Sequence, residues 1–195
     1  VVTRLKRAGA IIMGKTHTAE MAMSPPPPTV YPWNPKHTPG GSSTGSGVAV
    51  AARMCPVALG SQTGGSNLRP ASYNGLVGLK PTYGRISLYG VIPVSWSLDH
   101  LGVIVQTVED AALVLQGLAG YDPKDPSSSR RRNPDYHKAL NSLKRPLCIG
   151  RFREFFYENA DEETRAHIDS VAERLSQAGA IIDEVKLPEI FDVGR

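Results

Sequence analysis

The fold of this chain is decided by residues 34–82, which read NPKHTPGGSSTGSGVAVAARMCPVALGSQTGGSNLRPASYNGLVGLKPT. Two glycine-rich loops, 40–47 and 63–66, bracket an apolar segment and place Ser42 and Ser66 24 positions apart. Glycine on both sides of a serine allows backbone conformations closed to residues with a Cβ, so the hydroxyl can be exposed and successive N–H groups can converge. Nucleophilic acyl transfer needs this arrangement, because fixed donors beside the attacking oxygen stabilise a tetrahedral oxyanion.

Helices and strands are predicted to alternate along the chain. The proline-rich stretch 24–39 is predicted to be irregular, as a stiff surface excursion. Thr107, with Asp110 three residues later, is a good N-cap for a helix that ends before Gly120. The predicted elements are the end of a helix at 5–9, a short buried strand at 10–13, a helix at 46–53, strands at 57–60 and 77–79, a helix at 107–120, a strand at 147–150, a helix at 161–177 and a strand at 180–185. This alternation favours an α/β fold with mixed or parallel strands.

Residues 34–82 resemble the signature of the amidase signature family. The similarity continues through AGAIIMGKT at 8–16, through Ser-Leu-Asp at 97–99, and to Ile-Gly at 149–150. The resemblance implies a partial amidase signature fold of the α/β class, in which a mixed β-sheet core is covered by helices.

Family domains usually run to more than twice this length. The resemblance therefore implies that residues 1–195 form an incomplete amidase signature domain. Its signature core is expected at roughly 34–120, a loop at 121–145, and further helix and strand elements at 146–195.

The resemblance also assigns roles to the two loops. Ser66 corresponds to the family's nucleophile, and the backbone N–H groups of Thr63, Gly64, Gly65 and Ser66 correspond to the oxyanion hole. Ser42 corresponds to a relay that passes the proton of Ser66 to a lysine, next to an unusual cis peptide. A serine needs such a base or relay, because its hydroxyl pKa is far too high for unaided attack.

Simpler interpretations of these loops exist. Residues 63–66 alone could form a plain glycine-rich turn or a phosphate cradle. Near Ser42, either Ser43 or Ser46 could cap the helix that follows. A capping role for a neighbouring serine and a relay role for Ser42 are compatible.

The general base has no match in this sequence. The family places its catalytic lysine farther upstream than the 41 residues that precede Ser42. Lys15 belongs to a Gly-Lys-Thr segment that follows the lysine segment in the family, and neither Lys36 nor Lys80 lies in a matching context. The lysine is therefore expected upstream of Val1 or on a different polypeptide.

Two departures from the commonest family pattern bear on specificity. Gln62 stands where many members have Asp, and Leu68 stands where Arg is more usual, with Arg69 one residue later. An arginine this close to Ser66 could clamp a substrate carboxylate through two hydrogen bonds. It could equally pair with an acidic side chain of the protein and hold the loop.

Composition excludes some classes of protein. Lys and Arg outnumber Asp and Glu by 22 to 18, and the densest basic cluster, 130–132, lies in a Pro- and Ser-rich stretch without interleaved aromatic residues. That pattern indicates a solvated loop and argues against a nucleic-acid binder. The absence of an apolar run long enough for a bilayer, and of a signal-peptide pattern at the N-terminus, predicts a cytoplasmic protein without membrane association.

Cysteine and histidine give no metal signal. Cys55 and Cys148 show neither metal nor redox spacing and are expected to be small buried residues in a reducing compartment. The five histidines are scattered without zinc-site spacing, so no metal site is predicted. A Ser-His-Asp set could be assembled from Ser66, His100 and Asp99, but 97–99 resembles a structural loop near the family's site.

The sequence predicts an amidase. The resemblance implies hydrolysis of a linear or aryl amide of a small molecule through Ser66, without a metal or organic cofactor, with the isolated chain inactive. One alternative is the glutamine-hydrolysing component of a tRNA-dependent amidotransferase, its A-subunit, which works beside a partner subunit; another is a catalytically dead homologue. The resemblance also leaves a homodimer open.

Overall fold

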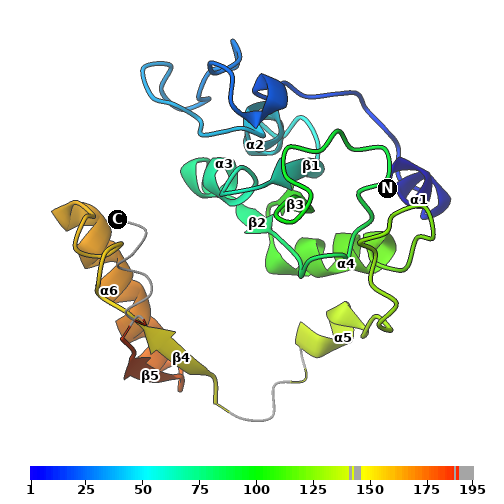
Figure 1. Cartoon of the computed structure of the whole chain (residues 1–195). Coiled ribbons are helices and arrows are strands. Elements are labelled where there is room, and N and C mark those ends of the chain that lie inside the picture. The colour runs from blue at the N-terminus through cyan, green and yellow to red at the C-terminus, as the bar shows by residue number, and fades with distance from the viewer. Residues whose placement is uncertain (141, 143–145, 187, 189–195) are drawn as a thin grey trace. The chain divides into compact units, whose positions relative to one another are not determined.

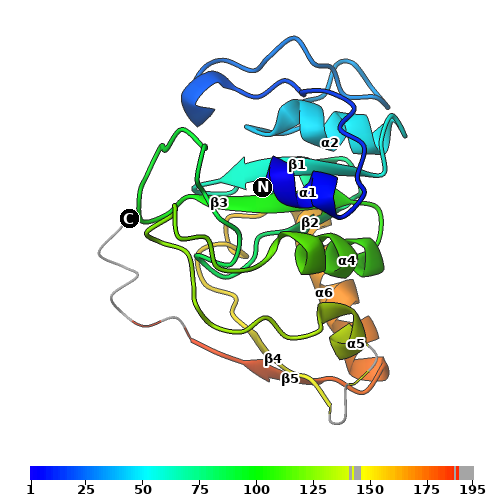
Figure 2. The same ribbon diagram turned by 90° about the vertical axis from the view of Figure 1, so that its right-hand side faces the viewer.

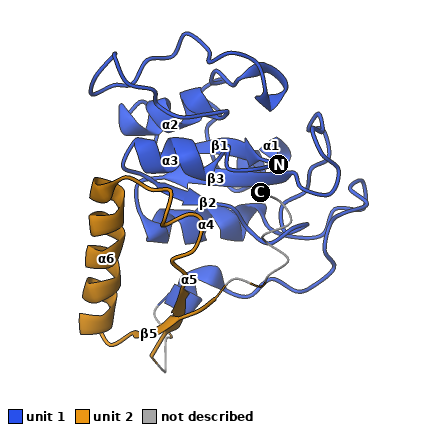
Figure 3. Cartoon of the chain, turned by 60° about the vertical axis from the view of Figure 1, so that its left-hand side comes forward, with its two compact units in different colours: residues 1–141 blue, residues 142–195 orange. Residues whose placement is uncertain are grey.

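A computed structural model describes residues 1–140, 142, 146–186 and 188 (Figure 1). The chain divides into two compact units, residues 1–141 and residues 142–195 (Figure 3). The described part of unit 1 contains a three-stranded sheet, and that of unit 2 contains a two-stranded sheet.

Unit 1 is built around an antiparallel sheet with the strand order β1-β3-β2. Val105 at one end of β3 pairs with Val57 of β1 on one side and with Val77 of β2 on the other. The elements of this unit are α1 (Val2–Arg7), η1 (Glu20–Ala22), α2 (Thr44–Ala51), β1 (Val57–Gln62), α3 (Leu68–Tyr73), β2 (Val77–Leu79), β3 (His100–Val105), α4 (Val108–Leu118) and α5 (Tyr136–Leu140).

The central strand β3 separates two hydrophobic clusters. Its sequence HLGVIV is buried from Leu101 onward, as expected for a strand covered on both faces. Because side chains alternate along a strand, Leu101, Val103 and Val105 pack with α4, whereas Ile104 packs with Val50 of α2. The sheet is therefore a layer between α2 and α3 on one face and α4 on the other. Figure 2 shows α2 and α4 on opposite sides of the sheet.

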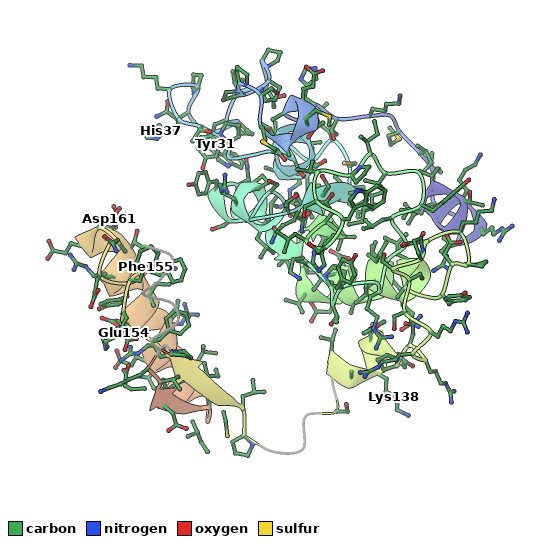
Figure 4. The ribbon with its side chains drawn as sticks, viewed as in Figure 1. Tyr31, His37, Lys138, Glu154, Phe155 and Asp161 are labelled. Atoms are coloured by element: carbon green, nitrogen blue, oxygen red, sulfur yellow. The ribbon has the colours of Figure 1, made fainter. Side chains whose placement is uncertain are left out.

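Unit 2 contains two parallel strands joined by a helix. Strand β4 (Cys148–Arg151) pairs with β5 (Ile181–Glu184), and α6 (Glu162–Gln177) lies between them in sequence. Asp161 lies at the start of this helix (Figure 4). It caps the helix by accepting a hydrogen bond from the Thr164 N–H at 2.7 Å.

Most predicted elements are confirmed, with shifted ends. Thr107 caps α4 by accepting a hydrogen bond from the Asp110 N–H at 3.1 Å. The helix predicted at 46–53 is α2, which begins two residues earlier, and the strand predicted at 57–60 continues to Gln62 as β1. The mixed α/β class is confirmed, with one antiparallel and one parallel sheet.

Two predictions about burial are wrong. Residues 10–13, predicted as a buried strand, carry no regular structure, and Ile11 and Met13 are 84% and 77% exposed. A strand needs a hydrogen-bonded neighbour, and none of the described strands pairs with this segment. Cys148, at the start of β4, is exposed, and Cys55 is only half-buried, because it packs at the edge of the cluster formed by Val50, Ala71 and Ile104.

Other elements were not predicted. The sequence does not predict α3, because Pro70 lies inside it, and it does not predict β3, because a turn-rich stretch precedes His100. The stretch 121–145, predicted as loop, contains the short helix α5. Residues 141 and 143–145 of that stretch, and 187 and 189–195 of the predicted region 146–195, lie outside the described residues.

Candidate active site

The two glycine-rich loops line one cavity of about 540 Å³ in unit 1. One loop leads into α2 and the other connects β1 to α3, so the sheet and two helices hold both loops (Figure 1). Most of the residues that the sequence singles out contribute to the cavity wall, namely Ser42, Thr63, Gly64, Ser66 and Arg69. Gly65, the remaining predicted oxyanion donor, does not line it and has a φ of +137°.

Hydrogen bonds join the two loops directly. The Ser43 N–H donates to the carbonyl of Ser66 at 3.1 Å. The Ser43 hydroxyl donates to the carbonyl of Ser61 at 3.2 Å and accepts from the Ser61 N–H at 3.1 Å. Ser43 stands at the N-cap of α2 but makes no capping bond, so the capping interpretation of this residue is wrong because β1 takes its hydroxyl.

Ser46 also bonds to β1 instead of capping the helix. It lies inside α2, where its hydroxyl donates to the carbonyl of Leu59 at 2.7 Å and lies 2.8 Å from Thr16 Oγ1. Together, Ser43 and Ser46 therefore fix the position of α2 and its loop against the strand that carries the other loop.

Ser42 is held in place by hydrogen bonds to its backbone carbonyl. Its carbonyl accepts hydrogen bonds from Thr18 Oγ1 at 2.9 Å and from the Ala19 N–H at 3.0 Å. The residue is 5% exposed, and its Oγ has no hydrogen-bond partner among the described residues. The Gly41–Ser42 peptide is cis, in agreement with the resemblance.

Asn67, immediately after Ser66, lies fully buried against the sheet. Gly60 and Gly102 face each other in the register of β1 and β3, and a Cβ on either would collide with the Asn67 side chain. The space left by these glycines admits the Asn67 amide, which donates to the carbonyls of Leu79 at 3.2 Å and Val103 at 3.4 Å. The sequence analysis missed this residue.

Gln62 organises the turn on the other side of Ser66. Its side-chain carbonyl accepts hydrogen bonds from the N–H groups of Asn67 and Leu68, both at 3.0 Å. The amide oxygen therefore satisfies two N–H groups at the start of α3, and Gln62 belongs to the loop architecture.

Asp99 connects the loop 63–66 to the segment before β3. Its carboxylate accepts hydrogen bonds from Thr63 Oγ1 at 2.5 Å, the Val94 N–H at 2.7 Å and the Ser95 N–H at 3.0 Å. Burial raises the pKa of Asp99, but these hydrogen bonds and the nearby His100 outweigh burial, and the pKa lies below its ordinary value. The Asp99 carboxylate is thus held ionised beside the first residue of the loop.

Arg69 projects from α3 at the cavity. A Cβ on Gly65 would lie 3.0 Å from Arg69 Nη2, so the guanidinium passes close to the glycine loop. Within the described part of the chain, no side chain or carbonyl forms an ion pair or hydrogen bond with this guanidinium. The acidic partner considered in the sequence analysis is therefore not found among these residues.

Comparison with known proteins agrees with this geometry. The sequence profile of the family described as Amidase matches residues 1–193. The chain belongs to the amidase family. It is 46% identical over 194 residues to the A-subunit of glutamyl-tRNA(Gln) amidotransferase from Carboxydothermus hydrogenoformans, an alignment that covers 96% of this chain and 40% of the relative.

Solved amidase-family structures share the fold. The A-subunit of glutamyl-tRNA(Gln) amidotransferase from Thermotoga maritima gives a TM-score of 0.89 at 36% identity, covering 97% of this chain and 43% of that one. The peptide amidase of Stenotrophomonas maltophilia gives 0.84 at 37% identity, covering 96% and 41%. The chain thus spans about 40% of the length of the curated relatives that it matches.

None of the lysines that the structure describes is hydrogen-bonded to the Ser42 hydroxyl. Lys15 and Lys36 are exposed, and Lys80 Nζ donates to the carbonyl of Pro81 at 3.2 Å. The alternative Ser-His-Asp set is not assembled, because His100 Nδ1 lies 2.6 Å from the carbonyl of Leu98 and Asp99 bonds to Thr63.

The residues with described positions contain no group of three or more His, Cys, Asp or Glu side chains that could hold a metal ion. None of their helices combines the length and the apolarity that a membrane span requires.

Proposed function

We propose that the protein to which this chain belongs hydrolyses an amide of a small molecule by acyl transfer through Ser66. One observation carries the proposal: Ser42 and Ser66 line the same cavity, on loops that the Ser43-to-Ser66 hydrogen bond ties together. Neighbouring serines on two fixed glycine-rich loops supply a nucleophile and a proton relay, which acyl transfer requires.

The proposed reaction proceeds in two stages. Ser66 Oγ attacks the amide carbon while its proton passes to Ser42 Oγ, and the proton of Ser42 passes to a base. The N–H groups of 63–66 hold the oxyanion. The C–N bond then breaks, the leaving nitrogen takes up a proton, and the acyl group stays on Ser66. Water hydrolyses this ester in the second stage and releases a carboxylic acid.

The proposed base is a lysine outside the described residues, on another part of the protein or on another polypeptide. The buried Oγ of Ser42 supports this, because it has no partner among the described residues and a buried hydroxyl without a partner is costly. A neutral lysine accepts a proton readily when a buried site lowers its pKa.

A second candidate is the glutamine-hydrolysing component of a tRNA-dependent amidotransferase. Relatives named as the A-subunit of glutamyl-tRNA(Gln) amidotransferase are 44–46% identical to this chain. In that case the substrate amide is the side chain of glutamine, and a partner protein takes up the ammonia. Glutamine-specific hydrolysis together with a co-purifying partner would favour this candidate.

The proposal is tested on the full-length protein with a panel of linear and aryl amides and glutamine. We expect Ser66→Ala to reduce kcat/KM by at least about a thousandfold and Ser42→Ala to have a comparable effect, because members of one catalytic unit are not additive. Ser72→Ala, an exposed serine on α3, is the matched control and should retain activity. Turnover that survives Ser66→Ala, or that is lost on treatment with a chelator, would contradict the proposal.

A further inference from the structure

A second cavity of about 250 Å³ adjoins the cavity that Ser42 and Ser66 line. Its wall is formed by Tyr31, His37, Thr38 and Tyr73, so three of its four residues carry aromatic rings. Thr38 and Tyr73 also line the main cavity, which makes the two cavities neighbours with a shared wall. Tyr31 and His37 come from the same irregular loop (Figure 4).

Tyr73 is positioned by the same elements that position the two serines. It lies four residues after Arg69 on α3, and residues at this spacing lie on one face of a helix, about 6 Å apart along the axis. Gly40, two residues before Ser42, has a φ of +77°, and a Cβ there would lie 3.2 Å from Tyr73 Cδ2. The Tyr73 ring thus rests against the backbone of the serine loop.

The loop that carries Tyr31 and His37 is fixed where it enters the site. Asn74 Nδ2 donates to the carbonyl of Pro39 at 2.8 Å, and the Gly40 N–H donates to Thr38 Oγ1 at 3.2 Å. The His37 N–H closes a turn on the carbonyl of Asn34 at 3.0 Å. The end of this loop, at residues 37–40, therefore has a defined place relative to α3.

We infer that this second cavity is a ring-binding subsite for the substrate of the proposed amide hydrolysis. The inference rests on the proposed function and adds a substrate class: amides that carry an aromatic or heteroaromatic ring several atoms from the scissile carbonyl. The ring packs against Tyr31 and Tyr73 in offset or edge-to-face geometry. The imidazole of His37 can donate to or accept from a polar ring substituent.

The size of the cavity fits a single ring. The second cavity is open to solvent on one side, and its volume of about 250 Å³ leaves room for one ring, since a buried cavity of about 150 Å³ already holds benzene. Because Arg69 lies one helical turn from Tyr73 toward Ser66, the ring must be connected to the amide by a chain that passes Arg69.

The test measures binding to the full-length protein carrying Ser66→Ala, so that no amide is consumed. The probes are phenylpentanamide and cyclohexylpentanamide, each with its ring on the terminal carbon, and pentanamide without a ring. We expect the phenyl compound to bind about three- to tenfold more tightly than the cyclohexyl compound, since aromatic pairing exceeds simple burial by that amount. Equal affinity for the two ring compounds would overturn the inference.

Substitutions of the two tyrosines test whether they produce the preference for the phenyl compound. Tyr31→Leu and Tyr73→Leu, each made in the Ser66→Ala background, should bring the two ring compounds to within about twofold of each other. Tyr31→Leu should also leave the binding of pentanamide unchanged, because Tyr31 does not line the main cavity. Trp33→Leu is the matched control, because Trp33 is an exposed aromatic residue of the same loop that lines neither cavity. A ring preference that persists in both tyrosine variants, or that disappears in Trp33→Leu, would contradict the subsite.

This test is independent of turnover. If the full-length protein carrying Ser66 hydrolyses no amide while the ring preference and its loss in the tyrosine variants are observed, the proposed function fails and the ring-binding cavity stands. If amides are hydrolysed without any ring preference, the subsite fails and the proposed function stands.

Discussion

The two walls of the main cavity are built in opposite ways. The inner wall, the serine loops at 40–43 and 63–66, lies on the sheet and the two loops bond to each other. The outer wall comes from the segment 20–38, which contains only the short turn η1 among regular elements, and Met23, which lines the cavity, is 79% exposed. Near the middle of this segment, Thr29 Oγ1 lies 2.9 Å from His17 Nδ1, and this hydrogen bond joins the outer wall to the rest of unit 1.

This difference separates chemistry from recognition. Reacting groups need positions fixed to fractions of an ångström, which a packed sheet and its short loops supply. Recognition tolerates variation, and an irregular segment can change its side chains without disturbing a core. The four prolines at 25–28 make the outer wall stiff without backbone hydrogen bonds, because each ring fixes φ and removes a donor.

Gly102→Ala is expected to have the largest effect on stability. The added Cβ would displace the Asn67 side chain, which packs against the sheet beneath the inner wall. The new Cβ would lie 2.5 Å from the carbonyl of Leu79 and 2.7 Å from Asn67 Nδ2. We expect the free energy of unfolding to fall by about 1–3 kcal/mol through overpacking, and kcat to fall because Asn67 precedes α3 directly after Ser66. Urea denaturation of the full-length protein measures the first effect, and amide turnover the second.

Gly14→Ala is the matched control for that prediction. No atom lies within 4 Å of a Cβ at Gly14, and its φ is not in the left-handed region. Its effect should remain within about 0.5 kcal/mol, as for other surface substitutions. If Gly102→Ala behaves like Gly14→Ala, the glycine pair does not hold Asn67 in place.

Asn67 also shows how far the sequence alone can lead. The serine loops and the strand that carries 57–60 could be predicted, because glycine spacing and apolar runs are local signals. The role of Asn67 could not, because it depends on Gly60 and Gly102 facing each other in a strand register that joins residues 42 positions apart. The prediction of a buried strand at 10–13 is wrong for the same reason, since burial depends on a neighbouring strand that sequence periodicity does not reveal.

Thr63→Val tests the link between the inner wall and Asp99. Valine keeps the shape of threonine and removes only the hydroxyl that donates to the carboxylate. A hydrogen bond to a charged group contributes about 1.5–3 kcal/mol, so we expect kcat to fall about tenfold as the N–H of residue 63 loses its position. KM should stay nearly constant, and Thr63→Ser should restore kcat, because serine retains the hydroxyl. A change in KM alone would contradict this positioning role.

Asp99 should also give the fold a pH dependence. Its pKa is lowered in the folded protein, so it stabilises the fold above its unfolded pKa of about 3.9, and this stabilisation is lost as the pH falls through the folded value. The full-length protein should therefore unfold more easily as the pH drops below about 4, and Thr63→Val should show a shallower loss over the same range. Denaturation at several pH values measures both slopes. Parallel slopes would show that Thr63 does not set the pKa of Asp99.

Substitutions of Arg69 are expected to have the smallest effect on catalysis. The backbone of this residue belongs to α3, but its side chain is exposed and has no partner among the described residues. We expect acyl groups that bear a carboxylate to be preferred over neutral ones, since a planar guanidinium binds a carboxylate through two hydrogen bonds. Solvent screening limits the preference to about three- to tenfold. Arg69→Lys should weaken it and Arg69→Ala should remove it, as measured by kcat/KM on a matched pair of amides with and without a terminal carboxylate. If the ratio stays unchanged in all three proteins while only stability falls, Arg69 belongs to the inner wall and does not recognise substrate.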